Sequence, residues 1–228
     1  MLLPLLLAPP LAYVAYSWGA HLGTLGCVWR GRRSSRRIAL TFDDGPDPEF
    51  TPRVLDLLDR AGVPGTFFLI GERAARAPDV VRAMTAGSHE VGNHTWSHTN
   101  LWKCGPRRTR LEVRRAHDLL AELTGRPPGL FRPPWGAVNL AVFPVLRRVG
   151  ARCVFWSIQP EGLRPIDAAT QAERVVRRAA PGAIVDLHDA EGTPNAPERL
   201  LEALPPMIAG LRERGYSFAT VSDLLARP

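Results

Sequence analysis

Cysteine and lysine are both scarce in this sequence of 228 residues. Three cysteines do not make a disulfide framework, and Cys153 stands in an apolar stretch where we expect a small core residue. Because Lys103 is the single lysine, the formal charge of +7 rests on arginines, most of which are interspersed with Asp and Glu. That scatter disfavours a nucleic-acid partner, which calls for a concentrated basic surface.

The first 29 residues contain no Asp, Glu, Lys or Arg. A membrane-spanning helix needs about 20 apolar residues, so we expect an uncleaved hydrophobic anchor over residues 1–29. A cleaved signal peptide is the alternative, although the sequence lacks the positively charged start of such peptides. Residues 30–37, RGRRSSRR, form an Arg-rich linker whose charge suits anionic lipid headgroups.

Residues 38–228 have the pattern of an α/β domain, in which apolar runs alternate with segments of helical periodicity. Strands are expected at residues 38–42, 66–70, 90–92, 130–132, 153–157, 183–187 and 217–220. Helices are expected at residues 51–61, 74–86, 107–123, 140–149, 167–180, 198–214 and 222–226. The alternation predicts parallel strands covered by helices, and its seven units indicate an incomplete barrel.

Acidic and histidine side chains follow two of these strands. Asp43 and Asp44 end the first strand, and His94 and His98 come just after the third. Carboxylate and imidazole together suit a divalent metal, and three protein ligands leave a position open for water. An Asp-Asp-Gly-Pro run is often only a turn, and two histidines four apart often bind nothing. Their common place at strand ends favours a catalytic metal site.

Four motifs occur in order and carry a family resemblance. They are TFDDGP at residues 41–46, HTWSH at 94–98, FRPPWG at 131–136 and IVDLHD at 184–189. The stretch at 51–71 also matches the family's usual helix and second strand. The chain resembles the polysaccharide deacetylases of the NodB-homology type, carbohydrate esterase family 4. The resemblance implies a distorted (β/α)7-type barrel and a metal-dependent hydrolase.

The resemblance implies a role for each residue of the first two motifs. Asp44, His94 and His98 match the metal ligands, with zinc expected and cobalt or manganese as alternatives. Asp43 matches the general base that takes a proton from water. Two adjacent carboxylates can do different work because a metal neutralises one of them.

The later motifs supply the remaining implied roles. Arg132 matches the arginine that holds the base, and the backbone N–H of Trp135 matches the oxyanion donor. His188 matches the catalytic acid, while Leu187 and Trp156 match residues of the substrate pocket. A surface arginine and a buried structural histidine are the alternative interpretations of Arg132 and His188.

Two departures from the family pattern concern His188. Gln159 stands where the family has an aspartate that orients the catalytic histidine, and Asp186 stands where the family has an apolar residue. A neutral amide cannot raise the pKa of a histidine as a carboxylate does. Our hypothesis is that Asp186 or Glu161 partly replaces the lost aspartate.

These observations predict an enzyme that removes N-acetyl groups from an envelope glycan such as peptidoglycan or a chitin-like oligosaccharide. O-deacetylation, or deacylation of a lipid-linked sugar, is a related alternative, and a catalytically silent glycan-binding protein is an alternative of another class. We expect a monomer, attached to the membrane by its N-terminal segment, with the domain facing the cell envelope. The Arg cluster after the anchor conflicts with that orientation under the positive-inside rule.

Overall fold

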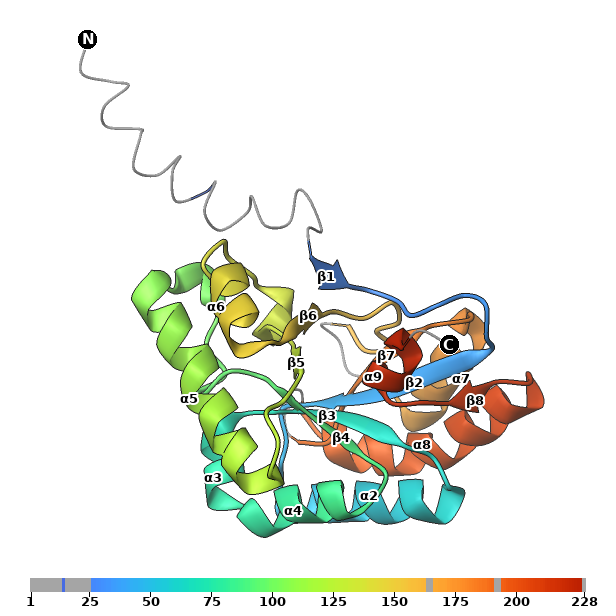
Figure 1. Ribbon diagram of the computed structural model, residues 1–228. Helices are drawn as coiled ribbons and strands as arrows, with labels where there is room; N and C mark the ends of the chain where they lie inside the picture. The colour runs from blue at the N-terminus through green and yellow to red at the C-terminus, as the bar shows by residue number, and fades with distance from the viewer. Residues whose placement is uncertain (1–13, 15–25, 163–165, 191–193, 227–228) are drawn as a thin grey trace.

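The computed structural model describes residue 14 and residues 26–162, 166–190 and 194–226, shown in Figure 1. The predicted anchor over residues 1–29 lies almost entirely outside these residues. Within the described part of the chain, no helix combines the length and the apolar character needed to cross a membrane.

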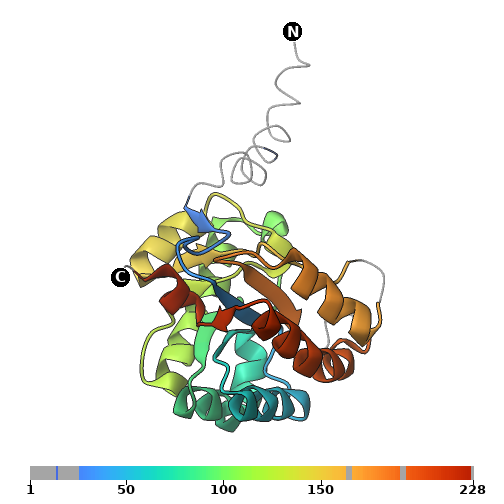
Figure 2. The same ribbon diagram turned by 90° about the vertical axis from the view of Figure 1, so that its right-hand side faces the viewer.

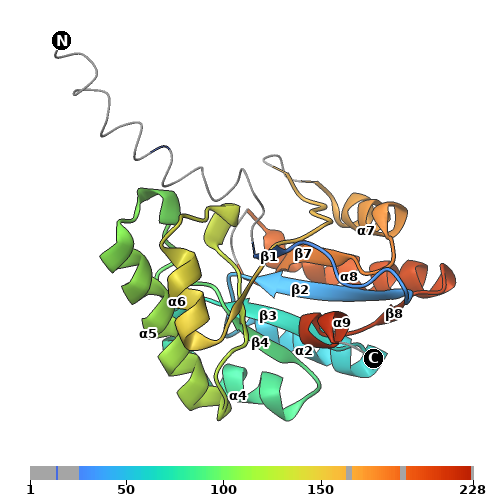
Figure 3. The ribbon, with the colours of Figure 1, turned by 45° about the horizontal axis from the view of Figure 1, so that its top comes forward.

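The strands form a curled sheet in which neighbours run parallel. They are β1 (Cys27–Val28), β2 (Arg37–Asp43), β3 (Gly65–Leu69), β4 (Glu90–Asn93), β5 (Leu130–Phe131), β6 (Arg152–Val154), β7 (Ile184–His188) and β8 (Ser217–Phe218). The order across the sheet is β1-β6-β5-β4-β3-β2-β7, with β8 paired to β2. Figure 3 shows β7, β2 and β3 side by side. Because Ile158, just after β6, bridges Val185 of β7, the sheet curls back on itself as a half-barrel.

The helices surround this sheet from outside, as the two views in Figures 1 and 2 show. They are α2 (Phe50–Ala61), α3 (Gly71–Arg76), α4 (Pro78–Ala86), α5 (Pro106–Thr124), α6 (Val142–Val149), α7 (Ala168–Arg178), α8 (Ala196–Glu213) and α9 (Val221–Leu225), with 3-10 turns η1 (Leu101–Lys103) and η2 (Pro134–Gly136). In Figure 1, α2 and α4 lie below the strands, α3, α5 and α6 on the left, and α7 and α8 on the right. The expected alternation of strand and helix is therefore present.

Helix α2 shows how the sequence produces one such layer. Val54, Leu55 and Leu58 recur at helical spacing and are buried, with Val54 and Leu58 fully excluded from solvent. Burying each of these side chains is worth about 1.5–3 kcal/mol. The helix ends at Gly62, whose left-handed backbone (φ 62°) suits a residue without Cβ.

The single helix that we expected at residues 74–86 is wrong. The structure has two helices there, α3 and α4, because Pro78 lacks the N–H that a continuous helix needs and clashes with the preceding turn. Ala77 at the junction has the non-helical φ of −132°. Pro78 instead begins α4, the position where a missing N–H costs nothing.

The structured domain begins earlier than the residue 38 that we expected. Cys27 and Val28 pair with Cys153 and Val154 of β6. The ring of Trp29 stacks on Phe155 with centroids 4.3 Å apart. Residues of the predicted linker also contact the domain, since Gly31 donates a hydrogen bond to the carbonyl of Gly182.

The largest core cluster lies between the sheet and helices α2, α4, α7 and α8. Phe42 of β2 and Phe67 of β3 are fully buried there and stack with ring centroids 4.7 Å apart. A Cβ at Gly65 would lie 2.9 Å from the Phe42 ring, so a larger residue at this strand start would displace the ring. The core therefore holds β2 and β3 in place, and with them the carboxyl end of β2, where Asp43 and Asp44 lie.

Candidate active site

The carboxyl end of β2 places two acidic side chains inside the barrel mouth. Asp43 is the last residue of the strand and is 3% exposed, and Asp44 is 4% exposed. Side chains alternate along a strand, so neighbours normally face opposite sides. Asp44 leaves the strand with φ 73°, which turns its carboxylate to the same side as that of Asp43. Aspartate tolerates this left-handed backbone better than most residues.

Asp44 and the two histidines converge on one point. Oδ1 of Asp44 lies 2.9 Å from Nε2 of His98 and 3.5 Å from Nε2 of His94. Burial alone would raise the pKa of Asp44, but contacts with His94 and His98 hold it well below its usual range. Nδ1 of His94 lies 2.7 Å from the carbonyl oxygen of Arg132, which makes it the donor and leaves Nε2 with its lone pair. One carboxylate and two imidazoles in this arrangement fit a divalent cation.

A buried glutamate on α5 holds the loop between the two histidines. The carboxylate of Glu112 accepts hydrogen bonds from the backbone N–H groups of Trp96 and Ser97 and from the Ser97 hydroxyl. His98, which follows, has the left-handed φ of 52°. Sequence reasoning missed Glu112. Its signal is a charge on the apolar stripe of α5, where Glu112 is only 2% exposed.

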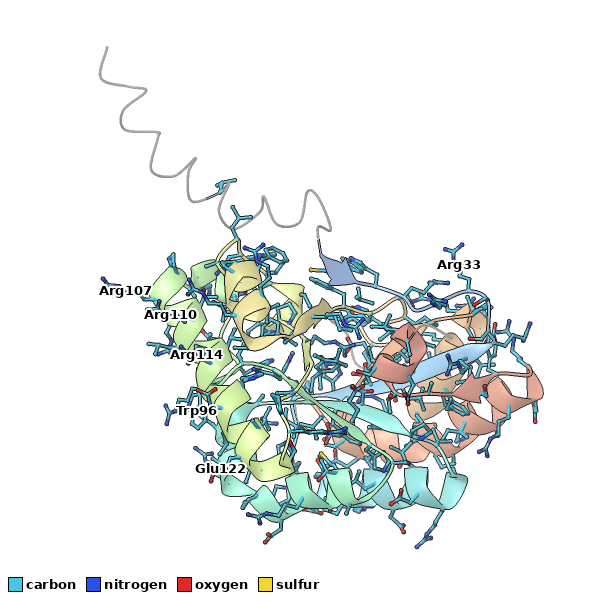
Figure 4. All side chains as sticks on the ribbon, in the orientation of Figure 1. Arg33, Trp96, Arg107, Arg110, Arg114 and Glu122 are labelled. Atoms are coloured by element: carbon cyan, nitrogen blue, oxygen red, sulfur yellow. The ribbon has the colours of Figure 1, made fainter. Side chains whose placement is uncertain are left out.

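Trp96 itself faces α5, away from the point where Asp44 and His98 meet. Its indole N–H donates to Glu72 at 3.0 Å, and the guanidinium of Arg115 stacks 3.6 Å from its ring centroid. Figure 4 shows Trp96 beside α5, with Arg107, Arg110, Arg114 and Glu122 along the same helix. The tryptophan therefore anchors the histidine loop to the helix rather than lining the site.

Arg132 connects the acidic residues beneath the site. It is fully buried, and its Nη1 lies 2.7 Å from Oδ1 of Asp43 and 2.7 Å from Oγ1 of Thr41. Nη2 donates to the carbonyl of Phe155 at 3.1 Å, and the guanidinium lies 4.1 Å from the Phe68 ring centroid. A guanidinium held in this way fixes the Asp43 carboxylate and balances its charge.

Asp186 approaches the same guanidinium from β7. Its Oδ1 lies 3.3 Å from Nη1 of Arg132, and the side chain is 2% exposed. Burial and the Asp43 carboxylate raise the pKa of Asp186 to about 7, against the opposing effects of His188 and Arg132. Asp186 therefore contacts Arg132, the arginine that also holds Asp43, whereas Glu161 is the carboxylate that lies close to His188.

His188 lies at the end of β7 with Glu161 against one of its ring nitrogens. Nδ1 of His188 is 3.4 Å from Oε2 of Glu161. Burial would lower the pKa of His188, but Glu161, with Asp186, raises it to about 10. Burial likewise would raise the pKa of Glu161, but His188 and then Arg199 lower it. Sequence reasoning missed Arg199, which is charged yet only 8% exposed on α8.

A cavity of about 710 Å³ lies over these groups. Of the residues with expected roles, it is lined by Asp43, Asp44, His94, His98, Trp135, Trp156, Gln159, Glu161, Asp186 and His188. Gln159 is exposed at its edge. Leu187 is not among the described residues that line the cavity. The expectation that Leu187 belongs to the substrate pocket is therefore wrong. Side chains alternate along β7, so Leu187 faces the core while Asp186 and His188 face the cavity.

The FRPPWG turn brings Trp135 to the cavity rim. Its side chain is 63% exposed, and its ring lies 4.3 Å from that of His98. The hydrogen bonds that close the turn are donated by Gly136 and Ala137 to the carbonyls of Pro133 and Pro134. Trp135 adopts the left-handed φ of 53°, and its N–H takes no part in those bonds. The geometry leaves this N–H available to a bound group.

Comparison with known proteins bears out the sequence resemblance. A family model described as polysaccharide deacetylase matches residues 30–154. The chain is 38% identical over 208 residues to a peptidoglycan-N-acetylglucosamine deacetylase of Bacillus cereus, covering 87% of this chain and 92% of the relative. It is 35% identical over 201 residues to a chitooligosaccharide deacetylase of Bradyrhizobium, covering 83% and 91%.

Solved structures lead to the same family. A peptidoglycan N-acetylglucosamine deacetylase superposes with a TM-score of 0.84 at 30% identity, covering 90% of this chain and 95% of that one. A CE4-family pseudoenzyme from Bacillus anthracis superposes with a TM-score of 0.80 at 25% identity, covering 88% and 69%. The chain belongs to the polysaccharide deacetylase family, the NodB-homology or CE4 family.

Proposed function

We propose that this protein is a metal-dependent hydrolase that removes N-acetyl groups from a glycan of the cell envelope. The observation that carries the proposal is the meeting of Asp44, His94 and His98 directly beside Asp43, whose carboxylate Arg132 holds. His188 stands on the neighbouring strand, in register with Asp43. Two separate groups able to move protons thus flank one cation site.

Asp44, His94 and His98 would hold the cation, for which zinc is the expected identity and cobalt or manganese the alternatives. Such an ion supplies Lewis acidity, which polarises an acyl carbonyl and acidifies water. The donor set supports this assignment because two imidazole nitrogens and one carboxylate oxygen suit borderline-hard cations.

The remaining residues divide the work of hydrolysis. Asp43 takes a proton from the attacking water, in the orientation that Arg132 imposes. The Trp135 N–H donates to the oxygen that becomes negative in the transition state, and one such donor is worth about 3 kcal/mol. His188 then donates a proton to the departing amine as the carbon–nitrogen bond breaks, which releases acetate and a free amino sugar.

The relatives support an amino-sugar polymer as substrate. Two of them, at 38% and 35% identity, are named for peptidoglycan N-acetylglucosamine and for chitooligosaccharides. Trp135 and Trp156 on the cavity lining offer flat apolar surfaces on which a sugar ring can pack. An O-acetylated polysaccharide and a lipid-linked sugar stay as alternative substrates for the same chemistry.

The different-class alternative is a silent glycan-binding protein. Gln159 favours it, because the family aspartate that charges the catalytic histidine is absent from that position. Glu161, 3.4 Å from His188, opposes it by returning a carboxylate to the histidine. A pseudoenzyme in the same fold makes the direct test of activity necessary.

We further propose that the uncharged segment ahead of β1 attaches the protein to the membrane and that the domain faces the cell envelope, where peptidoglycan is found. The uncharged N-terminal sequence supports attachment. Protease digestion of intact spheroplasts tests both parts. We expect protease added outside to digest the domain and an N-terminal fragment to stay in the membrane fraction. Protection of the domain contradicts the proposed orientation. Recovery of the intact domain in the soluble fraction before digestion contradicts membrane attachment.

The activity is tested on the full chain, stripped with a chelator and refilled with zinc, cobalt or manganese. We expect acetate release from peptidoglycan or N-acetylated chitooligosaccharides only after refilling, and its loss in Asp43→Asn. Asp79→Asn is the matched control, since its side chain is 95% exposed. Bound metal without acetate release from any of these substrates favours the silent alternative.

A further inference from the structure

The segment after β6 that carries Glu161 is held by two helices. From α7, Nη1 of Arg174 lies 3.0 Å from the carbonyl oxygen of Pro160, and Nε2 of Gln171 lies 3.0 Å from Oε1 of Glu161. From α8, Arg199 reaches the same carboxylate. Glu161 is 7% exposed, so these contacts replace water around its charge.

The guanidinium of Arg199 selects one oxygen of Glu161. Its Nε and Nη2 lie 2.9 Å and 2.7 Å from Oε1. With Oε1 occupied by Arg199 and Gln171, the other oxygen, Oε2, faces Nδ1 of His188 at 3.4 Å. Nη1 of Arg199 lies 3.2 Å from the carbonyls of both Pro194 and Asn195, which fixes the arginine to the start of α8.

We propose that Arg199 is a positioning residue for the proton donor His188 and acts through the carboxylate of Glu161. The proposal rests on the proposed hydrolase function and extends it to a residue on a helix outside the barrel. By holding Oε1, Arg199 keeps Oε2 directed at Nδ1 of His188, at an ion-pair distance of 3.4 Å. The opposite ring nitrogen, Nε2, is then the one left for a substrate in the cavity.

A structural role for the ion pair alone accounts poorly for this arrangement. Replacing a buried ion pair by apolar residues is often neutral or stabilising, so burial of Glu161 and Arg199 is weak evidence for a role in stability. A histidine held at one nitrogen by a carboxylate has a fixed tautomer and ring orientation, which is what a proton donor needs. The Glu161–Arg199 pair supplies the carboxylate that Gln159 does not.

Several charges act on His188, and an experiment must separate them. The charged groups that face it are Glu161 from the segment after β6, Asp186 from β7, and Asp43 and Asp44 from the end of β2. Arg199 acts from α8 through Glu161. A change in Arg199 leaves the three aspartates in place, and comparison of Arg199→Gln with Arg199→Lys separates the loss of the arginine's charge from the loss of its contact with Glu161.

The first test follows the ring nitrogens of His188 by ¹⁵N NMR in the full chain, with the resonance assigned from His188→Gln. In Arg199→Gln we expect the His188 titration to move to lower pH, because the Glu161 carboxylate leaves its fixed orientation. Glu161→Gln moves it further. Arg199→Lys keeps the charge but loses the two-pronged contact, so a smaller shift is expected, and this variant decides the matter if Arg199→Gln does not fold. Arg107→Gln on the exposed face of α5 is the matched control.

The second test compares kinetics of acetate release. A general acid contributes about a hundredfold to ten-thousandfold, so its partial misplacement predicts a fall in kcat of about tenfold in Arg199→Gln with KM little changed. The high-pH limb of the rate profile moves to lower pH in the same variant. If the Arg199 variants lose thermal stability but keep the wild-type His188 titration and kcat, the proposal is overturned. Absence of activity in the wild type overturns the proposed function instead, and the NMR titration still decides the role of Arg199.

Discussion

Replacement of Arg132 by methionine is expected to destabilise the protein because it leaves the buried carboxylate of Asp43 without a neighbouring cation. The guanidinium is fully buried and bonds Asp43 and Thr41 at 2.7 Å. Methionine is unbranched and apolar, so it replaces most of the aliphatic part of the arginine side chain. The change therefore removes the cation while retaining much of the packed volume.

The magnitude follows from what Arg132→Met leaves behind. Asp43 keeps a buried carboxylate without its cation, and Asp186 lies on the other side of the vacated space. Breaking a buried pair by removal of one partner costs about 3–5 kcal/mol. Adding Asp43→Asn removes the stranded charge and is expected to restore part of the loss, since an apolar partner and a neutral amide no longer conflict.

Urea unfolding of the metal-free chain measures this free energy. Chelator is kept present, because a cation bound only by the folded state would add its own stabilisation. Arg107→Met on the exposed face of α5 is the control and is expected to change the free energy of unfolding by less than about 0.5 kcal/mol. A cost below about 1 kcal/mol for Arg132→Met, or no recovery in the double variant, refutes the reasoning.

Three further predictions follow from neighbouring contacts. Asp186 has a pKa raised to about 7 in the folded protein, so its ionisation opposes folding as the pH rises from about 4 through 7. Asp186→Asn should therefore raise the free energy of unfolding at pH 8 and leave it unchanged at pH 3. Urea titrations at both pH values measure this difference. His98→Ala should abolish stoichiometric zinc binding in calorimetry, while wild-type-like affinity in this variant contradicts the ligand assignment. Gly92→Ala should destabilise by about 1–3 kcal/mol in the same urea assay, because its Cβ would lie 2.6 Å from the Phe68 ring; an unchanged midpoint shows that the ring can move.

Strand positions could be predicted from the sequence because apolar runs in a buried parallel sheet are nearly continuous. The expected strand at residues 38–42 corresponds to β2, and the expected helix at 51–61 corresponds to α2. The division of α3 from α4 follows from Pro78, a local signal that the periodicity of residues 74–86 masked. Strand β1 escaped prediction because two residues within an uncharged segment carry no periodic pattern.

The convergence of Asp44, His94 and His98 could be anticipated because these residues lie close to strand ends, which topology brings to one edge. The partners of His188 could not be assigned in the same way. Glu161 and Asp186 were equal candidates in the sequence, and only tertiary packing places Glu161 on Nδ1 while Asp186 meets Arg132. Arg199 lies 38 residues from Glu161, so no spacing rule links them. Leu187 was misplaced because a matched motif position does not reveal which face of β7 it occupies.

The most direct test of metal-dependent glycan deacetylation combines metal content with acetate release on the same preparation of the full chain. We expect zinc-refilled protein to release acetate from peptidoglycan, chelated protein to release none, and His98→Ala to lose metal and activity together. Acetate release that survives chelation contradicts the metal dependence, and stoichiometric metal without release from any acetylated glycan contradicts the assignment of the cavity as a deacetylase site.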